Sequence, residues 1–198
     1  MRRKAKQLSY YQSQVSNFER VLDFGCGNAR LTGANVVTVD FQEKLGPDVV
    51  HDLTKFPYPF EDDTFDFIHC SQIVEHLPDT TRTMSELLRI AKPGCKVYLG
   101  VPHFSAAIAH NDPTHVSFFS TKTIRYFTDG EITSGNKCLS MVGQHIEFSR
   151  IWERIGLSAA FNRLPRTYEE KLHGVFPAKF LHWELVVGEL PMASRMAA

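Results

Sequence analysis

The stretch Val21-Leu22-Asp23-Phe24-Gly25-Cys26-Gly27-Asn28, followed by Val36-Val37-Thr38-Val39-Asp40, decides the fold of this chain. The first run is apolar and ends in two glycines, which predicts a buried strand that enters a tight turn. Glycines there let the backbone bend sharply and let a ligand approach the main chain closely. The second run is rich in β-branched residues and ends in a carboxylate, which in nucleotide-binding sheets accepts hydrogen bonds from ribose hydroxyls. Together the two runs predict a nucleoside-binding pocket.

The glycine turn does not fit a dinucleotide. The fingerprint G-x-G-x-x-G requires a third glycine, and this chain has Arg30 there. That fingerprint also requires a helix after the turn, whose N-terminus faces the pyrophosphate. Only Gly25–Asn35 joins the two predicted strands, so the first crossover helix is cut to a turn or lost. These features disfavour a nicotinamide-dependent reductase.

The pattern apolar-apolar-Asp-x-Gly-x-Gly, with a following strand that ends at Asp40, resembles the class I S-adenosylmethionine-dependent methyltransferases of the type 11-like group. The resemblance continues through Asp52, Phe65–Leu77 and Lys96–Pro102 and covers roughly residues 20–128. The short connection after the glycines resembles a subset of short bacterial and archaeal members. The resemblance implies an α/β fold with a doubly wound, mostly parallel, seven-stranded Rossmann-like sheet whose last strand is antiparallel.

Residues 1–198 are expected to form a single methyltransferase domain in three segments. These are an N-terminal tail or helix (1–19), a cofactor-binding half (20–102), and a substrate loop with closing strands (103–198). In the N-terminal segment, residues 5–18 carry Leu8, Tyr11, Val15 and Phe18 on one helical stripe. Because the first crossover helix is missing, part of one sheet face lacks apolar cover. We expect this stripe, or a second copy of the chain in a homodimer, to supply it.

The remaining elements follow from local patterns. Strands are predicted at Asp48–Leu53, Phe65–Ser71, Lys96–Val101, Ile146–Trp152 and Phe180–Val187, and helices at Thr80–Ala91 and Thr121–Thr128. Asp129–Val142 is polar with three turn residues and is read as a mobile segment. Pro102–Ser120 has no clear periodicity, and a loop of this length in a compact domain is usually functional.

The resemblance also implies a cofactor, S-adenosyl-L-methionine, and residues that hold it. The set consists of Asp23, Gly25, Gly27, Asp40, Phe41, Asp52, Leu53, Ser71 and Gln72. Asp40 is expected to bind the ribose hydroxyls. Asp52 has the place of the family's acid that binds the adenine amino group, with a turn-capping aspartate as the alternative.

Methyl transfer to a hydroxyl requires a base near the ends of the fourth and fifth strands. The catalytic candidates are His103, His115 and His76, because imidazole titrates near neutral pH. Pro102 fixes the exit of the loop after the fifth strand, so His103 is expected nearest to the transferred methyl group. An amine or thiolate acceptor would need no base.

The segment Gln72-Ile73-Val74-Glu75-His76 resembles the metal-binding segment of some small-RNA and quinone-pathway methyltransferases. Carboxylate and imidazole ligands suit a divalent ion. Gln72 stands where the resemblance requires a first glutamate, so we expect no metal. The alternatives are a structural role for the Glu-His pair and direct contact with the substrate. For the histidines of the loop 103–115 three roles are open: metal binding, substrate contact or acid–base work, and a structural role.

Composition limits the partners and the compartment. The chain has 22 basic and 22 acidic residues, which argues against a broad surface that neutralises nucleic-acid phosphates. The expected partner is a small-molecule acceptor, methylated on oxygen or nitrogen; the alternatives are a nucleic-acid methyltransferase and a non-catalytic S-adenosylmethionine-binding module. Four scattered cysteines without a C-x-x-C pair indicate buried thiols in a reducing compartment, so we expect a cytoplasmic protein. No apolar run reaches the roughly 20 residues that a membrane-spanning helix needs.

Overall fold

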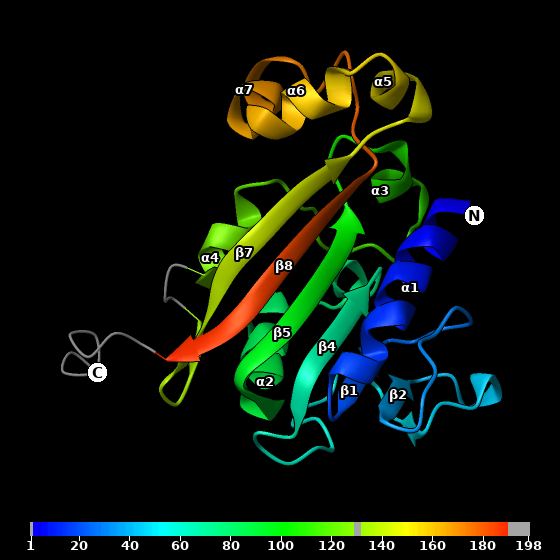
Figure 1. Cartoon of the computed structure of the whole chain (residues 1–198), viewed down its shortest axis with the longest axis vertical. Coiled ribbons are helices and arrows are strands. Elements are labelled where there is room, and N and C mark those ends of the chain that lie inside the picture. Colours follow the sequence, from blue (N-terminus) through cyan, green and yellow to red (C-terminus); the bar gives the residue numbers. More distant parts are fainter. Residues whose placement is uncertain (1, 129–131, 190–198) are drawn as a thin grey trace.

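A computed structural model of the chain describes residues 2–128 and 132–189, arranged as one mixed sheet with helices on both faces (Figure 1). The helices are α1 (Arg2–Gln14), α2 (Thr80–Ile90), α3 (Ala107–Asn111), α4 (Thr123–Thr128), α5 (Arg150–Arg154), α6 (Leu157–Arg163) and α7 (Pro165–Lys171). The strands are β1 (Val21–Phe24), β2 (Val36–Asp40), β3 (Val49–Val50), β4 (Phe65–Ser71), β5 (Ala91–Pro102), β6 (Thr133–Ser134), β7 (Lys137–Glu147) and β8 (Phe180–Glu189). Short 3-10 turns lie at η1 (Val15–Asn17), η2 (Glu43–Leu45) and η3 (Val74–His76).

The strand order is β3-β2-β1-β4-β5-β8-β7-β6. Strands β1 to β5 pair in parallel, whereas β8 runs antiparallel to both β5 and β7. This arrangement confirms the predicted α/β fold with a mostly parallel sheet and an antiparallel last strand. Because the order reverses at β1, the carboxyl ends of β1, β2 and β4 meet at a switch point, where open sheets of this kind bind ligands.

The closing strands differ from the prediction. The strand expected at Ile146–Trp152 is wrong: β7 ends at Glu147 and α5 begins at Arg150. In the described part of the segment 129–142, β6 and β7 form a hairpin around Gly135, which has a φ of 61°. The polar composition suits β7 because a strand near the sheet edge has one solvated face. The two-residue β6 raises the strand number from the predicted seven to eight, and residues 129–131 lie outside the described residues.

The connection between β1 and β2 contains no helix in residues 25–35, as predicted. Side chains fix this connection instead. The Asp23 carboxylate accepts a hydrogen bond from the backbone N–H of Leu31 at 2.7 Å. Arg30 donates to the carbonyl of Gly46 at 2.8 Å and thereby ties the connection to the turn after β2. The third strand is also shorter than predicted, because the Asp48 carboxylate binds the N–H and hydroxyl of Thr38 and only Val49–Val50 pairs.

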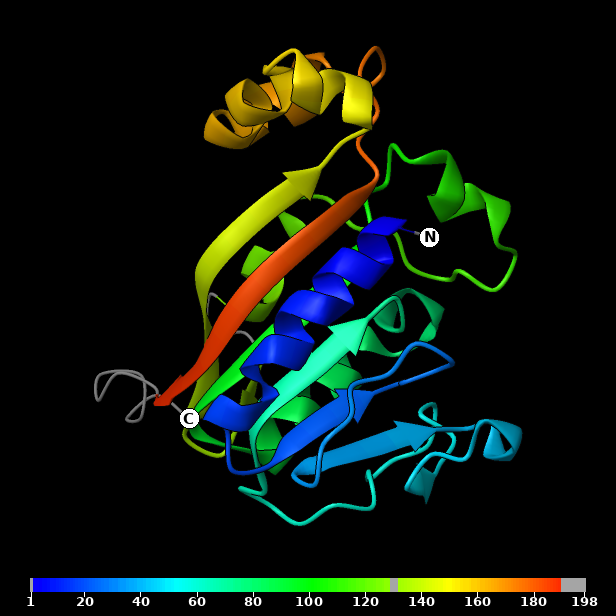
Figure 2. The same ribbon diagram turned by 45° about the vertical axis from the view of Figure 1, so that its right-hand side comes forward.

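Helix α1 covers the sheet face that the missing crossover leaves open (Figure 2). Tyr11 and Val15 form a buried cluster with Val21, Leu31, Phe67 and Tyr98. The ring centroids of Tyr11 and Tyr98 lie 4.3 Å apart. The predicted cover by the N-terminal stripe is therefore confirmed, and a homodimer stays a prediction. The opposite face carries the main core, in which Met84, Leu87 and Leu88 of α2 are buried.

Two further expectations concern the cysteines and the membrane. All four cysteines are buried free thiols in the structure, and burial raises the pKa of the Cys26 thiol to about 11. No helix in the described ranges combines the length and the apolar character that crossing a bilayer demands.

Candidate functional site

The glycine turn after β1 is held close to β2 and to η3. Gly25 and Gly27 have φ values of 67° and 54°, a left-handed region that favours glycine. The N–H groups of Gly25 and Cys26 both donate to the carbonyl of Val39, at 2.9 and 3.1 Å. A Cβ atom on Gly25 would lie 2.4 Å from Cγ1 of Ile73, so only glycine fits. The turn thus presents bare backbone at the carboxyl end of the sheet.

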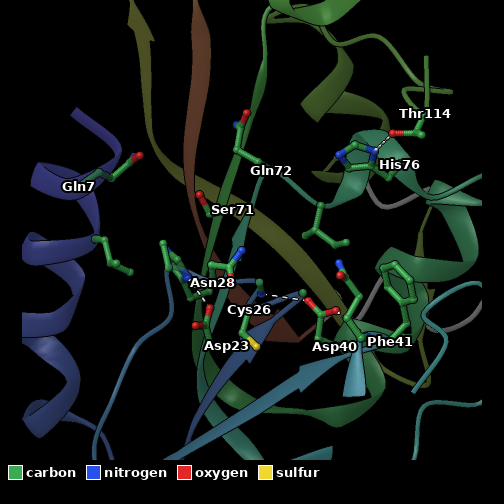
Figure 3. A pocket seen from close by; sticks show the side chains of 17 residues that line it. Gln7, Asp23, Cys26, Asn28, Asp40, Phe41, Ser71, Gln72, His76 and Thr114 are labelled. Atoms are coloured by element: carbon green, nitrogen blue, oxygen red, sulfur yellow. Dashed lines mark hydrogen bonds and ion pairs between the residues drawn. The ribbon is translucent and has the colours of Figure 1, made fainter. Parts of the chain in front are cut away.

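Asp40 ends β2 and holds the same turn from the other side (Figure 3). Its side chain is only 5% exposed. Oδ2 accepts from the N–H of Gly27 and Oδ1 accepts from the N–H of Gln42, each at 2.9 Å. Each carboxylate oxygen has a second lone pair, so Asp40 can accept further hydrogen bonds from ribose hydroxyls.

A cavity of about 470 Å³ opens beside these residues, a volume typical of a small-ligand site. It receives side chains or backbone from α1, the glycine turn, the tips of β2 and β4, and η3 (Figure 3). The predicted cofactor and catalytic residues that line it are Asp23, Gly25, Gly27, Asp40, Phe41, Ser71, Gln72 and His76. Phe41 stands at the rim of the cavity, is 64% exposed, and offers an aromatic face to a nucleobase.

Asp52 and Leu53 do not line this cavity. Oδ1 of Asp52 accepts from the N–H and the hydroxyl of Thr54, at 3.0 and 2.8 Å, and these bonds lower the pKa of Asp52. The side chain therefore makes the turn-capping interaction that the sequence left as the alternative to adenine binding. Leu53 is buried, and its carbonyl accepts from the Tyr58 hydroxyl at 3.2 Å.

A second cavity of about 620 Å³ adjoins the first. The two share Gln7, Ser71, Gln72 and His76. The second cavity extends from there under α3 and α5 to the start of β8, and its other lining residues are Glu75, Ile108, Asp112, His115, Glu147, Arg150, Lys179, Phe180 and His182. His76 and His115 thus lie together, with His76 at the junction.

A chain of hydrogen bonds sets the tautomer of His76. The Thr114 hydroxyl donates to Oδ1 of Asp112 at 2.6 Å, so its oxygen is an acceptor for Nδ1 of His76 at 2.9 Å. Nδ1 therefore carries the hydrogen, and Nε2 is left with a lone pair. Burial, followed by the proximity of His115, lowers the pKa of His76, which keeps the ring neutral at pH 7. The ring is thus in the form that a general base needs.

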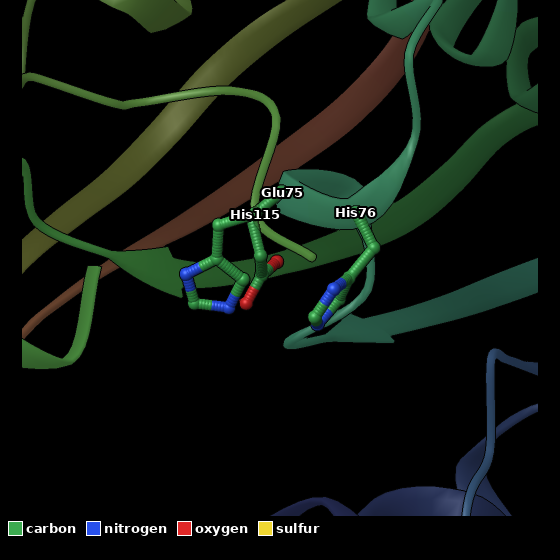
Figure 4. Close-up of side chains that lie close together, drawn as sticks. All are labelled: Glu75, His76 and His115. Atoms are coloured by element: carbon green, nitrogen blue, oxygen red, sulfur yellow. The ribbon is translucent and has the colours of Figure 1, made fainter. Parts of the chain in front are cut away.

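His115 is arranged in the same way. Its Nδ1 lies 3.0 Å from the carbonyl of Ala109, which can only accept, so Nδ1 carries a hydrogen and the neutral tautomer has its lone pair on Nε2. The two imidazole rings lie 4.6 Å apart in an edge-to-face arrangement. With the buried carboxylate of Glu75 they offer three ligand atoms within 4.8 Å of one another, a set that can hold a divalent cation (Figure 4).

His103, which the sequence placed nearest to the transferred methyl group, lines neither of these two cavities. Its side chain is 0% exposed; Nε2 contacts Oε1 of Glu169 at 3.0 Å and Nδ1 contacts the Ser105 hydroxyl at 2.8 Å. The reason is that β5 stays paired with β8 as far as Pro102, and the N–H of His103 donates to the carbonyl of Lys179. This pairing directs the imidazole toward α7, where it joins the loop to the helix.

Gln7, Leu8 and His69 are among the lining residues that the sequence did not assign to the site. Gln7 and Leu8 come from α1, whose stripe indicated contact with the sheet but not with the ligand. His69 comes from β4, where alternation places it on the same face as Phe67 and Ser71. That alternation was a signal that could have identified His69.

The strand order, the glycine turn and the acidic tip of β2 together define a class I, Rossmann-like methyltransferase fold. A family model described as "Methyltransferase domain" matches residues 2–133, about two thirds of the chain. The chain belongs to this family of S-adenosylmethionine-dependent methyltransferase domains.

Two curated relatives illustrate the similarity. A ubiquinone biosynthesis O-methyltransferase of Dechloromonas aromatica is 34% identical over 103 residues, which cover 41% of this chain and 43% of that protein. A demethylmenaquinone methyltransferase of Streptomyces avermitilis is 34% identical over 97 residues, 41% of each chain. The chain therefore spans less than half the length of these relatives.

Solved structures share the fold at low identity. An S-adenosylmethionine-dependent methyltransferase from Archaeoglobus fulgidus superposes with a TM-score of 0.61 at 18% identity and 91% coverage of both chains. The N-methyltransferase NodS of Bradyrhizobium japonicum has a TM-score of 0.58 at 15% identity, covering 95% of this chain and 96% of that one. The [4+2]-cyclase SpnF has a TM-score of 0.59 at 13% identity, covering 92% and 81%. The same fold thus occurs in a protein named for a different reaction.

Proposed function

We propose that this protein transfers a methyl group from S-adenosyl-L-methionine to a small-molecule acceptor. The observation that carries the proposal is the junction of two cavities at the carboxyl end of β4. The first has the glycine turn and the acid that a nucleoside needs, and the second opens beside two histidines. A donor in the first cavity and an acceptor in the second would meet at Gln72 and His76.

The cofactor fits the first cavity by its donor and acceptor pattern. Asp40 would accept the ribose hydroxyls, Phe41 would lie against the adenine, and Gly25 and Gly27 would allow the chain of the amino-acid part to pass close to the backbone. When bound, this cofactor supplies an activated methyl group, so the protein's main task is to align donor and acceptor. Cofactor contacts by Asp52 and Leu53 would require a rearrangement of the turn at Thr54.

His76 at the junction, and His115 beside it in the second cavity, support oxygen as the methyl acceptor. A hydroxyl must lose its proton near the moment of transfer, and His76 has a free lone pair on Nε2 with a lowered pKa. His115 is the second candidate for this role. The named activities of the curated relatives include an O-methyltransferase, which agrees with this choice, and the NodS likeness keeps nitrogen as an alternative acceptor.

The test has two stages. Calorimetry with S-adenosylhomocysteine and with NAD first identifies the cofactor class; we expect binding of the former alone. The chain is then incubated with methyl-labelled S-adenosylmethionine and a cell extract that has been separated into metabolite, nucleic-acid and protein fractions. Label in the metabolite fraction is expected, label in nucleic acid alone would refute the small-molecule acceptor, and binding without any transfer would indicate a non-catalytic module.

A further inference from the structure

His69 lies in the middle of β4 and lines the first cavity, although its side chain is only 4% exposed. Nδ1 of the ring is 2.8 Å from Oδ1 of Asp23 on the neighbouring strand β1. The ring stacks on Tyr98, with the centroids 5.1 Å apart and the planes at 16°. The Tyr11 ring of α1 packs against both, with its centroid 5.4 Å from that of His69 and 4.3 Å from that of Tyr98. The imidazole is therefore fixed in position and direction.

The second ring nitrogen of His69 is available to a ligand. Nε2 makes no hydrogen bond with any residue in the described ranges, and it is not among the atoms that are sealed from solvent. Since His69 lines the first cavity, this nitrogen is reached from the cavity. A protonated imidazole has two N–H donors, of which one is held by Asp23 and the other is left for an acceptor.

The sheet order places His69 where the amino-acid part of the cofactor has to lie. Asp40 is on β2, and β4 is on the opposite side of β1. A nucleoside whose ribose is held at Asp40 extends its other end across the glycine turn, toward β4. His69 pairs in register with Asp23, two residues before Gly25.

The cavity offers few alternatives for an anionic group. None of its described lining residues is a lysine or an arginine, whereas Asp23 and Asp40 are both acidic. The N–H groups of Gly25, Cys26 and Gly27 are already used by Val39 and Asp40. The two lining imidazoles are those of His69 and His76. Of these, His69 is the one on the strand next to the glycine turn, in register with Asp23 of β1, and neutral amides such as Gln7 and Asn28 line the same cavity.

We propose that His69, oriented by Asp23, binds the carboxylate of the amino-acid part of S-adenosylmethionine. This assignment rests on the proposed function, since it assumes that the cofactor occupies the first cavity. In this arrangement Nδ1–H donates to the Asp23 carboxylate and Nε2–H donates to the ligand carboxylate, so the ring bridges the two carboxylates. His69 would then discriminate the complete cofactor from nucleosides that lack the carboxylate.

The test compares three ligands by calorimetry. S-Adenosylhomocysteine has the carboxylate and the amine, its decarboxylated analogue has only the amine, and methylthioadenosine has neither. His69→Asn keeps a donor near the Nδ1 position for Asp23 but removes Nε2, whereas His69→Gln keeps a donor near Nε2. His51→Gln is the control, because that imidazole contacts the Lys55 carbonyl outside the cavity.

We expect His69→Asn to weaken binding of S-adenosylhomocysteine at least tenfold and to leave the other two ligands within twofold. His69→Gln should recover part of the loss, and the control should behave as wild type. Equal loss for all three ligands, or no loss, would overturn the assignment while leaving the proposed function intact. A wild-type chain that binds none of the three would overturn the proposed function itself. If the variants do not fold, a crystal structure with S-adenosylhomocysteine decides: Nε2 within about 3 Å of a carboxylate oxygen supports the assignment, and a carboxylate bound elsewhere refutes it.

Discussion

Replacement of Asp40 by alanine is the most direct test of the nucleoside site. The carboxylate accepts two backbone N–H groups, each at 2.9 Å, and is the acid at the tip of β2. A hydrogen bond to a charged group contributes about 1.5–3 kcal/mol. Because about 1.4 kcal/mol corresponds to a factor of ten in affinity, each ribose bond that is lost should weaken S-adenosylhomocysteine binding about tenfold to a hundredfold.

The variant also removes the acceptor for Gly27 and Gln42, so the turn itself can change. A matched control separates this effect from ligand contact. Asp48 likewise accepts a backbone N–H and a hydroxyl, both from Thr38, but it does not line the cavity. Asp48→Ala should lower the melting temperature and leave affinity within about twofold of wild type.

Calorimetry on both variants, with circular dichroism to establish folding, gives the answer. A folded Asp40→Ala chain with unchanged affinity would refute the ribose assignment. An Asp48→Ala chain that loses as much affinity as Asp40→Ala would show that both aspartates act through the backbone of the β2 region, which would remove the evidence for a direct contact.

Three other predictions follow from the same geometry. Tyr11→Ala should destabilise the chain by about 3–5 kcal/mol, because the buried ring packs on Tyr98 at 4.3 Å, whereas the exposed Tyr10→Ala should change the denaturation midpoint little. If the acceptor atom is oxygen, the rate of turnover should fall at low pH with a midpoint below the ordinary imidazole pKa of about 6.5, because the pKa of His76 is lowered and the neutral base persists to lower pH. Thr114→Val removes the hydroxyl that contacts Nδ1 of His76 and should shift this midpoint. Dialysis against EDTA should leave turnover unchanged if Glu75, His76 and His115 act without a metal, and recovery on adding Mn²⁺ or Mg²⁺ to an inactivated sample would contradict this.

The parts of the site that were predictable from the sequence depend on local chemistry. Gly25 and Gly27 adopt positive φ because the strand has to turn there, and Asp40 stands at a strand end that any parallel sheet brings to the same edge. The missing helix was predictable too, since eleven residues between two strands cannot hold a full crossover. For these features the cause and the effect lie within a few residues of each other.

The position of His103 was not predictable, because its partner is 66 residues away in the sequence. The Pro102-His103 segment looks like a loop entrance, but the pairing of β5 with β8 continues through it and turns the imidazole toward Glu169. Burial alone would raise the pKa of Glu169; the hydrogen bonds from His103 and Thr121 outweigh it and lower that pKa. Only the tertiary arrangement of α7 decides this outcome.

The absent crossover helix also explains why α1 belongs to the candidate site. In a complete crossover, a helix that follows the glycine turn would cover this face of the sheet. Here α1 and the following turn η1 cover it, with Tyr11 of α1 and Val15 of η1 over the apolar strands. Gln7 and Leu8 of α1 stand at the wall of the first cavity. The Gln7 amide also lies 2.8 Å from Nδ1 of His182, which lines the second cavity. One helix therefore stabilises the sheet and contacts both cavities, so the cofactor and acceptor sites that we propose share a wall that comes from outside the glycine-turn motif.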